Sequence, residues 1–425
     1  MSKSRILKGT EGFEELATRV GLTPMEREAR RASLERSYMP FQCTEHYMEL
    51  IASLDEPYRT QVLNIVLPPP GLAPYQGRFD PYGNTTVGRD ESPFLQHKYD
   101  TTLLVHFVDV CVSSCQFCYK VNEIRHEGWS AGQTHLKVAA ALEYLDGHPQ
   151  VNNVLFTGGD PAAVGSKVLV RSIRRLLQHP NVRVVRFATK TLAFDPLRFM
   201  DPELLDFFEE VQQMRGKQVV MINQFNHPAE LSGASGEVLE ALRRRGVQMR
   251  GQPAVVKGVN DDVDTLVDLQ QRFLDHGVVS YYLTTFMPVR GVEQYGLTLD
   301  EVFLRVAAAK RRLSGLEKKG VLLASHDFGK FEIVGFAPRP EAPERIILKW
   351  HQAAMTKYLP QALLDRVPTR PEDVMILDYH PGTYCIDHLF RDNGLPHFDS
   401  GNQLHLASPM ETVVPMPTPA RVRAG

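Results

Sequence analysis

From about residue 100 to residue 314, the chain alternates between apolar runs of strand length and helix-patterned stretches. The expected strands are 102–109, 151–157, 182–188, 219–224, 247–256 and 278–286, and the expected helices are 135–145, 166–177, 235–245, 263–274 and 299–314. This order predicts an α/β fold in which a parallel sheet, with helices outside, curls into a partial barrel. The carboxyl ends of the strands then share one rim, where barrel enzymes place their chemistry.

The sequence on either side of the alternation has a different character. Thr23 and Pro24 suit the start of a helix, and helical patterns are followed by a segment rich in turn-forming residues. We expect a helical arm with an irregular linker over 1–95, the barrel over 96–325, a small α+β extension over 326–408 and a disordered, proline-rich tail over 409–425. Within the extension, strands are expected at 331–336 and 345–350 and a helix at 352–364.

Three cysteines, Cys111, Cys115 and Cys118, lie in a short loop directly after the first expected strand. Three thiolates can bind three irons of a [4Fe–4S] cluster and leave the fourth iron open. The alternatives are three buried structural cysteines or a zinc loop, although zinc would need a fourth Cys or His and none is close. The other two cysteines, Cys43 and Cys385, are expected to be packed thiols.

Gly158, Gly159 and Asp160 follow the second expected strand. Two glycines let the backbone approach a ligand closely, and their amides together with a carboxylate suit an ammonium or carboxylate group. A tight turn is the alternative interpretation of the same three residues.

The spacing C-x3-C-x2-C, with Phe117 before the last cysteine and Gly-Gly-Asp one strand later, resembles the radical S-adenosylmethionine (SAM) enzymes. The resemblance implies a TIM-like partial (β/α)6 barrel whose [4Fe–4S] cluster holds SAM and reduces it to give a 5′-deoxyadenosyl radical. It also implies an external electron donor of the flavodoxin or ferredoxin type. The residues expected to bind SAM are Phe117, Gly158, Gly159, Asp160, Asn226 and Gln252.

Several longer segments resemble one particular family of radical SAM enzymes. Five segments resemble motifs of the lysine 2,3-aminomutase family, both in their amino-acid sequence and in their order along the chain. They are 45–51, 97–99, 155–161, 225–231 and 252–262. That family also uses pyridoxal phosphate (PLP), because moving an amino group between neighbouring carbons through a radical requires the nitrogen to be held as an imine. Lys330 occupies the place of the PLP lysine, although a lysine at the start of a strand is often a solvated residue. Tyr99, Lys98 and His227 are expected to contact PLP.

The departures from the family pattern concern the cofactor phosphate and the substrate. Thr102 replaces an arginine that binds the phosphate, and Lys98 is expected to compensate in part. Lys120 is expected to pair with the substrate carboxylate in place of an arginine. Met287 stands where the family has a carboxylate for the far ammonium of lysine, which leaves only Asp327 for that role. We therefore expect an amino-acid substrate other than lysine.

The bulk properties exclude some classes of partner. With 48 Lys and Arg against 50 Asp and Glu, the formal net charge is −2, which predicts no general attraction to nucleic acid or to an anionic membrane. The sequence has neither an apolar run long enough to cross a membrane nor a signal core, so we expect a cytoplasmic protein. A small amino-acid-like substrate is the expected partner, and homo-oligomerisation is left open.

Three functions fit the sequence. The first is a PLP-dependent 2,3-aminomutase, an isomerase. The second is a radical SAM enzyme without PLP, such as an epimerase, dehydrogenase or lyase, which the lost arginine at Thr102 favours. The third is a non-catalytic iron–sulfur or zinc-binding protein.

Overall fold

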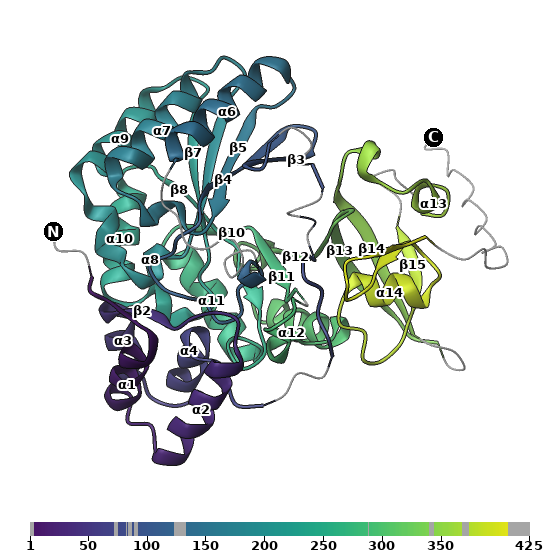
Figure 1. Cartoon of the computed structure of the whole chain (residues 1–425), viewed down its shortest axis with the longest axis horizontal. Helices are drawn as coiled ribbons and strands as arrows, with labels where there is room; N and C mark the ends of the chain where they lie inside the picture. Colours follow the sequence, from purple (N-terminus) through teal and green to yellow (C-terminus); the bar gives the residue numbers. More distant parts are fainter. Residues whose placement is uncertain are drawn as a thin grey trace.

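The computed structural model describes residues 4–71, 75–81, 83, 87–88, 92–122, 133–287, 289–339, 344–367 and 374–406. Figure 1 shows a sheet with helices along its outer side, the purple N-terminal helices at one end, and the green and yellow C-terminal strands on the opposite side of the molecule. The expected α/β class is confirmed by this arrangement. The expected tail over 409–425 lies outside the described residues.

The main sheet has seven strands in the order β10-β8-β7-β6-β5-β4-β3, and only β3 is antiparallel to its neighbour. The strands are β3 (Leu95–Tyr99), β4 (Thr102–Val108), β5 (Asn153–Gly158), β6 (Val184–Thr189), β7 (Gln218–Asn223), β8 (Gln248–Gly251) and β10 (Val278–Ser280). The helices between them are α6 (Thr134–Gly147), α7 (Ser166–Gln178), α8 (Thr191–Phe194), α9 (Pro202–Gln213), α10 (Gly233–Arg244) and α11 (Val263–Asp275). Neighbouring strands therefore follow chain order from β4 to β10, as the alternation predicted.

The fifth and sixth expected strands are each broken in the middle. β8 is followed after Gln252 and Pro253 by β9 (Ala254–Val255), and β10 is followed after Tyr281 by β11 (Tyr282–Thr285). β9 and β11 belong to a second sheet in the order β15-β14-β13-β12-β11-β9. Its further strands are β12 (Val321–His326), β13 (Gly329–Ala337), β14 (Glu344–Ala353) and β15 (Met375–Tyr379). At each break the chain therefore passes from the first sheet to the second.

The expected helix over 352–364 is wrong. β14 continues to Ala353 because it pairs with β13, where Lys330 lies opposite Gln352, and this pairing outweighs the local helical pattern. Within this range only a 3-10 turn (Thr356–Tyr358) and the short α13 (Gln361–Leu364) are helical, and α13 begins directly after Pro360. β12, which precedes the Lys330 hairpin, was not among the expected strands.

The remaining elements lie at the two ends of the chain. The N-terminal elements are β1 (Ile6–Lys8), α1 (Gly9–Arg19), α2 (Pro24–Arg36), β2 (Gln42–Thr44), α3 (Glu45–Ala52) and α4 (Tyr58–Val66). The C-terminal elements are α12 (Leu299–Arg311), α14 (Ile386–Asp392), β16 (His397–Phe398) and β17 (Leu404–His405). Thr23 caps α2 in a reciprocal capping box with Glu26, as its sequence predicted.

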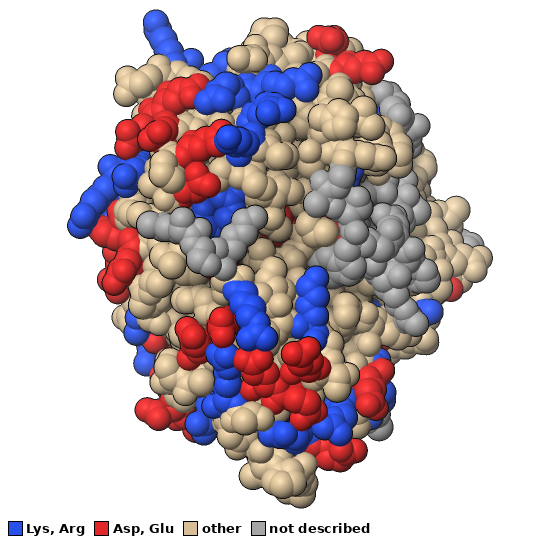
Figure 2. Space-filling view, turned by 60° about the vertical axis from the view of Figure 1, so that its left-hand side comes forward, with Lys and Arg blue, Asp and Glu red and all other residues tan. Residues whose placement is uncertain are grey.

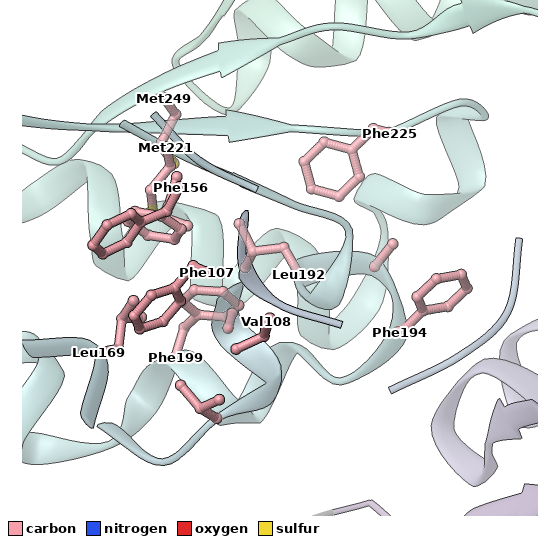
Figure 3. Packing of buried hydrophobic residues seen from close by; sticks show 14 of the residues in the cluster. Phe107, Val108, Phe156, Leu169, Leu192, Phe194, Phe199, Met221, Phe225 and Met249 are labelled. Atoms are coloured by element: carbon pink, nitrogen blue, oxygen red, sulfur yellow. The ribbon is translucent and has the colours of Figure 1, made fainter. Parts of the chain in front are cut away.

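The two faces of the main sheet have different chemistry. On the face toward the helices, Phe107 of β4 and Phe156 of β5 stack with their centroids 4.2 Å apart, and Met221 and Met249 extend this core (Figure 3). The side chains of a strand alternate between faces, so Arg186 lies on the opposite face. Arg250 likewise alternates with the buried Met249. We call this second, partly polar face the inner face of the sheet.

The described surface carries mixed charge. On the face shown in Figure 2, basic and acidic side chains are interspersed around a central depression. Pairs such as Arg174 with Glu210 and Arg243 with Glu240 lie at the surface. No helix in the described part of the chain is long and apolar enough to cross a membrane.

Gly158, at the end of β5, should not tolerate a side chain. Its φ is +109°, and a Cβ there would lie 2.1 Å from the carbonyl oxygen of Val108. We expect Gly158→Ala to lower the free energy of unfolding by about 3 kcal/mol, measured by denaturant titration followed by circular dichroism. The control is Gly315→Ala, an exposed position with open space, where we expect a change within about 0.5 kcal/mol. Equal effects in the two variants would contradict this prediction.

Candidate functional site

The cysteine loop leaves the carboxyl end of β4 and is held from two sides. On one side, the backbone N–H groups of Gly159 and Asp160 donate to the carbonyls of Val108 and Val110, at 2.5 and 2.8 Å. A Cβ on Gly159 would lie 2.3 Å from the Val110 carbonyl oxygen. The glycines therefore allow the close approach that their sequence predicted, but the backbone they approach is that of this loop.

The N-terminal arm holds the other side of the cysteine loop. The side chain of Gln42 donates to the Cys111 carbonyl at 2.7 Å, and the backbone N–H of Thr44 donates to the Ser113 hydroxyl at 3.0 Å. The backbone N–H of Gln116 donates to the carbonyl of Ile65. This support could not be predicted from the sequence, because the partners are about 50 to 70 residues apart in the chain.

The three thiols of the loop are half-buried and lie near one another. Burial raises the pKa of Cys111, and the negative charges of Asp160, Cys118 and Cys115 raise it further. Among the described residues, no three His, Cys, Asp or Glu side chains converge on the position of a single ion. A cubane cluster binds each thiolate through a different iron, so its ligands stay apart. The donor set fits a cluster with one open iron better than it fits zinc.

Asp160 has a structural role that the sequence did not reveal. One carboxylate oxygen accepts hydrogen bonds from the hydroxyls of Thr189 and Thr191 and from the backbone N–H groups of Lys190 and Thr191, all within 2.9 Å. The other oxygen caps Ala162 at 2.9 Å. Burial raises the pKa of Asp160, and these bonds oppose the rise. The expectation that Asp160 mainly positions SAM is corrected: its carboxylate ties the ends of β5 and β6 together.

His227 is packed against the N-terminal arm. Its ring is fully buried, one nitrogen lies 2.9 Å from the Gln61 side-chain oxygen, and Tyr58 packs edge-on against it. Burial lowers the pKa of His227 to about 3. His227 therefore connects the rim of the sheet to α4, and its contact with PLP stays a prediction.

The other expected SAM residues are spread along the rim. Asn226 is fully buried and accepts a hydrogen bond from Lys190 at 3.2 Å, so it acts through that lysine. Gln252 is half-buried between β8 and β9. Phe117 packs edge-on against Tyr295, with centroids 5.8 Å apart.

Lys190 is a site residue that the sequence did not single out. Its ammonium pairs with Glu230 at 2.5 Å and donates to the Gln224 carbonyl at 2.7 Å. Tyr47 of α3 donates to the same carboxylate at 2.7 Å. Burial raises the pKa of Cys115, and the positive charge of Lys190 opposes that rise. The lysine thus places a cation beside the cysteine loop.

Lys330 lies at the start of β13 and is half-buried, packed against aromatic rings. Its Nζ is 5.1 Å from the ring centroid of Tyr99 and 5.3 Å from that of Tyr282, and 3.3 Å from the side-chain oxygen of Gln352. Burial lowers the pKa of Lys330 to about 7, and the nearby charges of Arg186 and Lys98 contribute. At neutral pH, a large fraction of this amine is therefore uncharged and nucleophilic.

Two further lysines lie close to the inner face. Lys98 donates to the carbonyl of His326 at 2.5 Å, and burial lowers its pKa to about 8. Lys120 is buried, with its Nζ 3.4 Å from a ring nitrogen of His106 on β4. The structure therefore brings Tyr99, Lys98 and Lys330 together, as the resemblance implied, and places Lys120 at the other end of β4.

Asp327 is committed to an internal ion pair. Both of its carboxylate oxygens accept from the guanidinium of Arg78, at 2.6 and 3.1 Å, and the side chain is 1% exposed. Arg78 also pairs with Asp387 at 3.0 Å, and Asp387 lies 2.9 Å from His326. Asp327 therefore already has a cationic partner, which it shares with Asp387, and this makes it poorly suited to receive a substrate ammonium. The cluster instead fixes the turn that leads to Lys330.

The sequence of this chain is similar to those of several known proteins. The chain is 32% identical over 330 residues to an Aquifex aeolicus protein named "Putative L-lysine 2,3-aminomutase", covering 77% of this chain and 85% of that protein. It is 26% identical over 352 residues to the L-lysine 2,3-aminomutase of Clostridium subterminale, covering 82% and 81%. A radical SAM methyltransferase structure from Sphaerobacter thermophilus aligns with 51% of this chain and 66% of its own, with a TM-score of 0.34 and 15% identity, a likeness too distant to define the architecture. No protein-family model matches the chain.

The loop, the strand-end motifs and these relatives together define a radical SAM enzyme. The chain belongs to the lysine 2,3-aminomutase family, as a divergent member. Membership implies a [4Fe–4S] cluster and SAM.

The hydrogen bonds of Asp160 lead to a test of its structural role. In Asp160→Asn, an amide group that cannot accept replaces a buried carboxylate oxygen or forces a rotation of the side chain. We expect the free energy of unfolding to fall by about 3 kcal/mol, measured by denaturant titration of the protein without SAM. Asp275→Asn, at an exposed helix end, is the control and should shift it by less than about 0.5 kcal/mol. If Asp160→Asn were as stable as the wild type, the structural role of this carboxylate would be contradicted, and only its role in ligand binding would be left.

Proposed function

We propose that this protein is a PLP-dependent radical SAM aminomutase that moves the amino group of an amino acid other than lysine between neighbouring carbons. The two connected sheets would form the partial (β/α)6 barrel of that reaction, with the cysteine loop at the carboxyl ends of its strands. The observation that carries the proposal is the environment of Lys330, an internal amine between Tyr99 and Tyr282 with its pKa lowered to about 7. A structural lysine would not need this uncharged state.

The residues of the chain have distinct roles in this proposal. Cys111, Cys115 and Cys118 would hold the cluster, and Lys190 places a positive charge beside Cys115. Lys330 would bond covalently to PLP, which supplies an imine nitrogen that can migrate past a neighbouring carbon radical. Lys120 is the available cation for the substrate carboxylate. A flavodoxin-type or ferredoxin-type protein would supply the electron.

The substrate side chain is expected to carry no ammonium group. Leu323 or Ala324 stands where the family resemblance implies a second carboxylate for the ammonium of lysine, and both are buried and apolar. Met287 offers only a thioether, and Asp327 is already paired with Arg78. A terminal ammonium brought into this environment would be desolvated without a carboxylate partner, which disfavours lysine.

Lys330 can be tested through its bond to PLP. After incubation with PLP and reduction with borohydride, peptide mass analysis should find the pyridoxyl group on the peptide that contains Lys330. The rate of PLP binding, followed by absorbance, should rise with pH through a midpoint near 7, because the uncharged amine is the nucleophile and its lowered pKa brings this state into the neutral range. The groups that face Lys330 are Arg186, Lys98, Tyr99, Tyr282 and His351.

Lys330→Ala should lose both the adduct and the absorbance change. Lys349→Ala, a control at the partly exposed ion pair with Glu332, should keep both. A wild-type protein that takes up no PLP would favour a radical SAM enzyme that works without it.

The reaction itself can be tested with anaerobically reconstituted protein, SAM, dithionite and PLP. A panel of neutral and acidic α-amino acids should contain one that stimulates 5′-deoxyadenosine formation and yields its β-amino acid, both measured by mass spectrometry. Lysine should be turned over about 100-fold less efficiently, as expected for about 3 kcal/mol of unpaired ammonium. Cys118→Ala is the negative control, because it should form no 5′-deoxyadenosine. Cys385→Ala is the matched control outside the cysteine loop and should bind as much iron as the wild type. Lysine as the best substrate would refute the substrate assignment.

A further inference from the structure

Arg186 is a cation on the inner face of the sheet that no role described above explains. It lies on β6 between Val185 and Phe187, which belong to the hydrophobic core, so its own side chain projects to the other face. Its backbone is in register with Leu155 of β5, and its Nε donates to the side-chain oxygen of Asn153 at 2.8 Å.

The guanidinium of Arg186 is directed toward the amino-terminal end of β4. Asn153, which accepts its hydrogen bond, is directly opposite Thr102 in the pairing of β4 with β5. Arg186 therefore reaches across β5 to the surroundings of a threonine whose short side chain carries no charge. Tyr99 is opposite the same Thr102 in the pairing of β3 with β4, which brings the Lys330 environment to this end of the sheet.

The basic groups of Arg186 and Lys330 are close enough for the charge of one to act on the other. Within the described residues, neither of them has an ion pair with a carboxylate. Burial lowers the pKa of Arg186, and the charge of Arg186 is the second contribution, after burial, to the lowered pKa of Lys330. A guanidinium held at the inner face without a carboxylate partner costs free energy, and an anionic ligand beside it would offset that cost.

We propose that Arg186 binds the phosphate group of PLP and so supplies the guanidinium that Thr102 cannot. The proposal rests on the function proposed above, since it requires PLP on Lys330. A guanidinium presents its N–H groups in a planar fork that matches two phosphate oxygens, whereas a lysine offers a point charge. Nε remains on Asn153, which fixes the plane of the fork. The guanidinium also hydrogen-bonds to the side chain of Tyr281, and its remaining N–H groups are those available to the ligand.

The experiment compares PLP with pyridoxal, which has the same aldehyde and ring but no phosphate. Dissociation constants are measured by absorbance for the wild type, Arg186→Gln and Arg186→Lys. We expect Arg186→Gln to weaken PLP binding roughly 10- to 100-fold and to change pyridoxal binding less than threefold. Arg186→Lys should be intermediate. Inorganic phosphate should compete with PLP in the wild type and lose this effect in Arg186→Gln.

The matched control is Arg250→Gln. Arg250 alternates with Met249 on β8, lies on the same inner face, and donates to Gln248 and to the Met249 carbonyl. The substitution Arg250→Gln should leave the affinity for PLP unchanged. Melting curves of all variants identify those that fail to fold, and Arg186→Lys keeps the test valid if Arg186→Gln does not fold.

Each other outcome overturns the proposal in a distinguishable way. PLP affinity equal to that of the wild type in Arg186→Gln would show that the phosphate lies elsewhere. Equal losses for PLP and pyridoxal would show that Arg186 only positions neighbouring side chains such as Asn153. No PLP binding by the wild type would remove the PLP-dependent function as well as this proposal.

Discussion

The internal ion cluster around Arg78 is the interaction on which the geometry of the site depends. Arg78 comes from the linker before the sheet, Asp327 from the turn between β12 and β13, and Asp387 from α14 near the end of the described chain. These charges are almost fully buried, so removing one of them would leave another without compensation. The cluster therefore fixes three distant segments relative to one another, and one of them carries Lys330 three residues after Asp327.

A comparable arrangement surrounds the cysteine loop. Its support comes from β2 and α4 on one side and from the Gly158–Asp160 turn on the other. The two reactive regions are then connected through the main sheet, because β4 leads into the cysteine loop at one end and pairs with Tyr99 at the other. Buried polar contacts with defined partners keep such loops in one geometry, which a reaction between separately bound groups requires.

The lysines of this protein differ in their environment, and the differences separate their roles. Lys190 has a carboxylate partner in Glu230 and lies beside the cysteines. Lys330 has no carboxylate partner among the described residues and lies near other cations, so its amine loses its proton near neutral pH. The same residue type thus provides a fixed charge in one place and a nucleophile in another, because burial and neighbouring charge act on the two protonation states differently.

The sequence by itself determined the strand–helix order, the capped start of α2, the cysteine loop and the family. Each of these depends on the local spacing of residues or on sequence motifs in a defined order along the chain. Only the tertiary structure decided that β14 extends through residues expected to be helical. It also decided that Asp160 binds the end of β6, that His227 contacts α4 and that Asp327 pairs with Arg78. It also placed Arg186 beside Asn153 and Lys330. These outcomes depend on pairs that lie far apart in the sequence, and a side chain's burial and charge partners are set only when the sheets bring those pairs together.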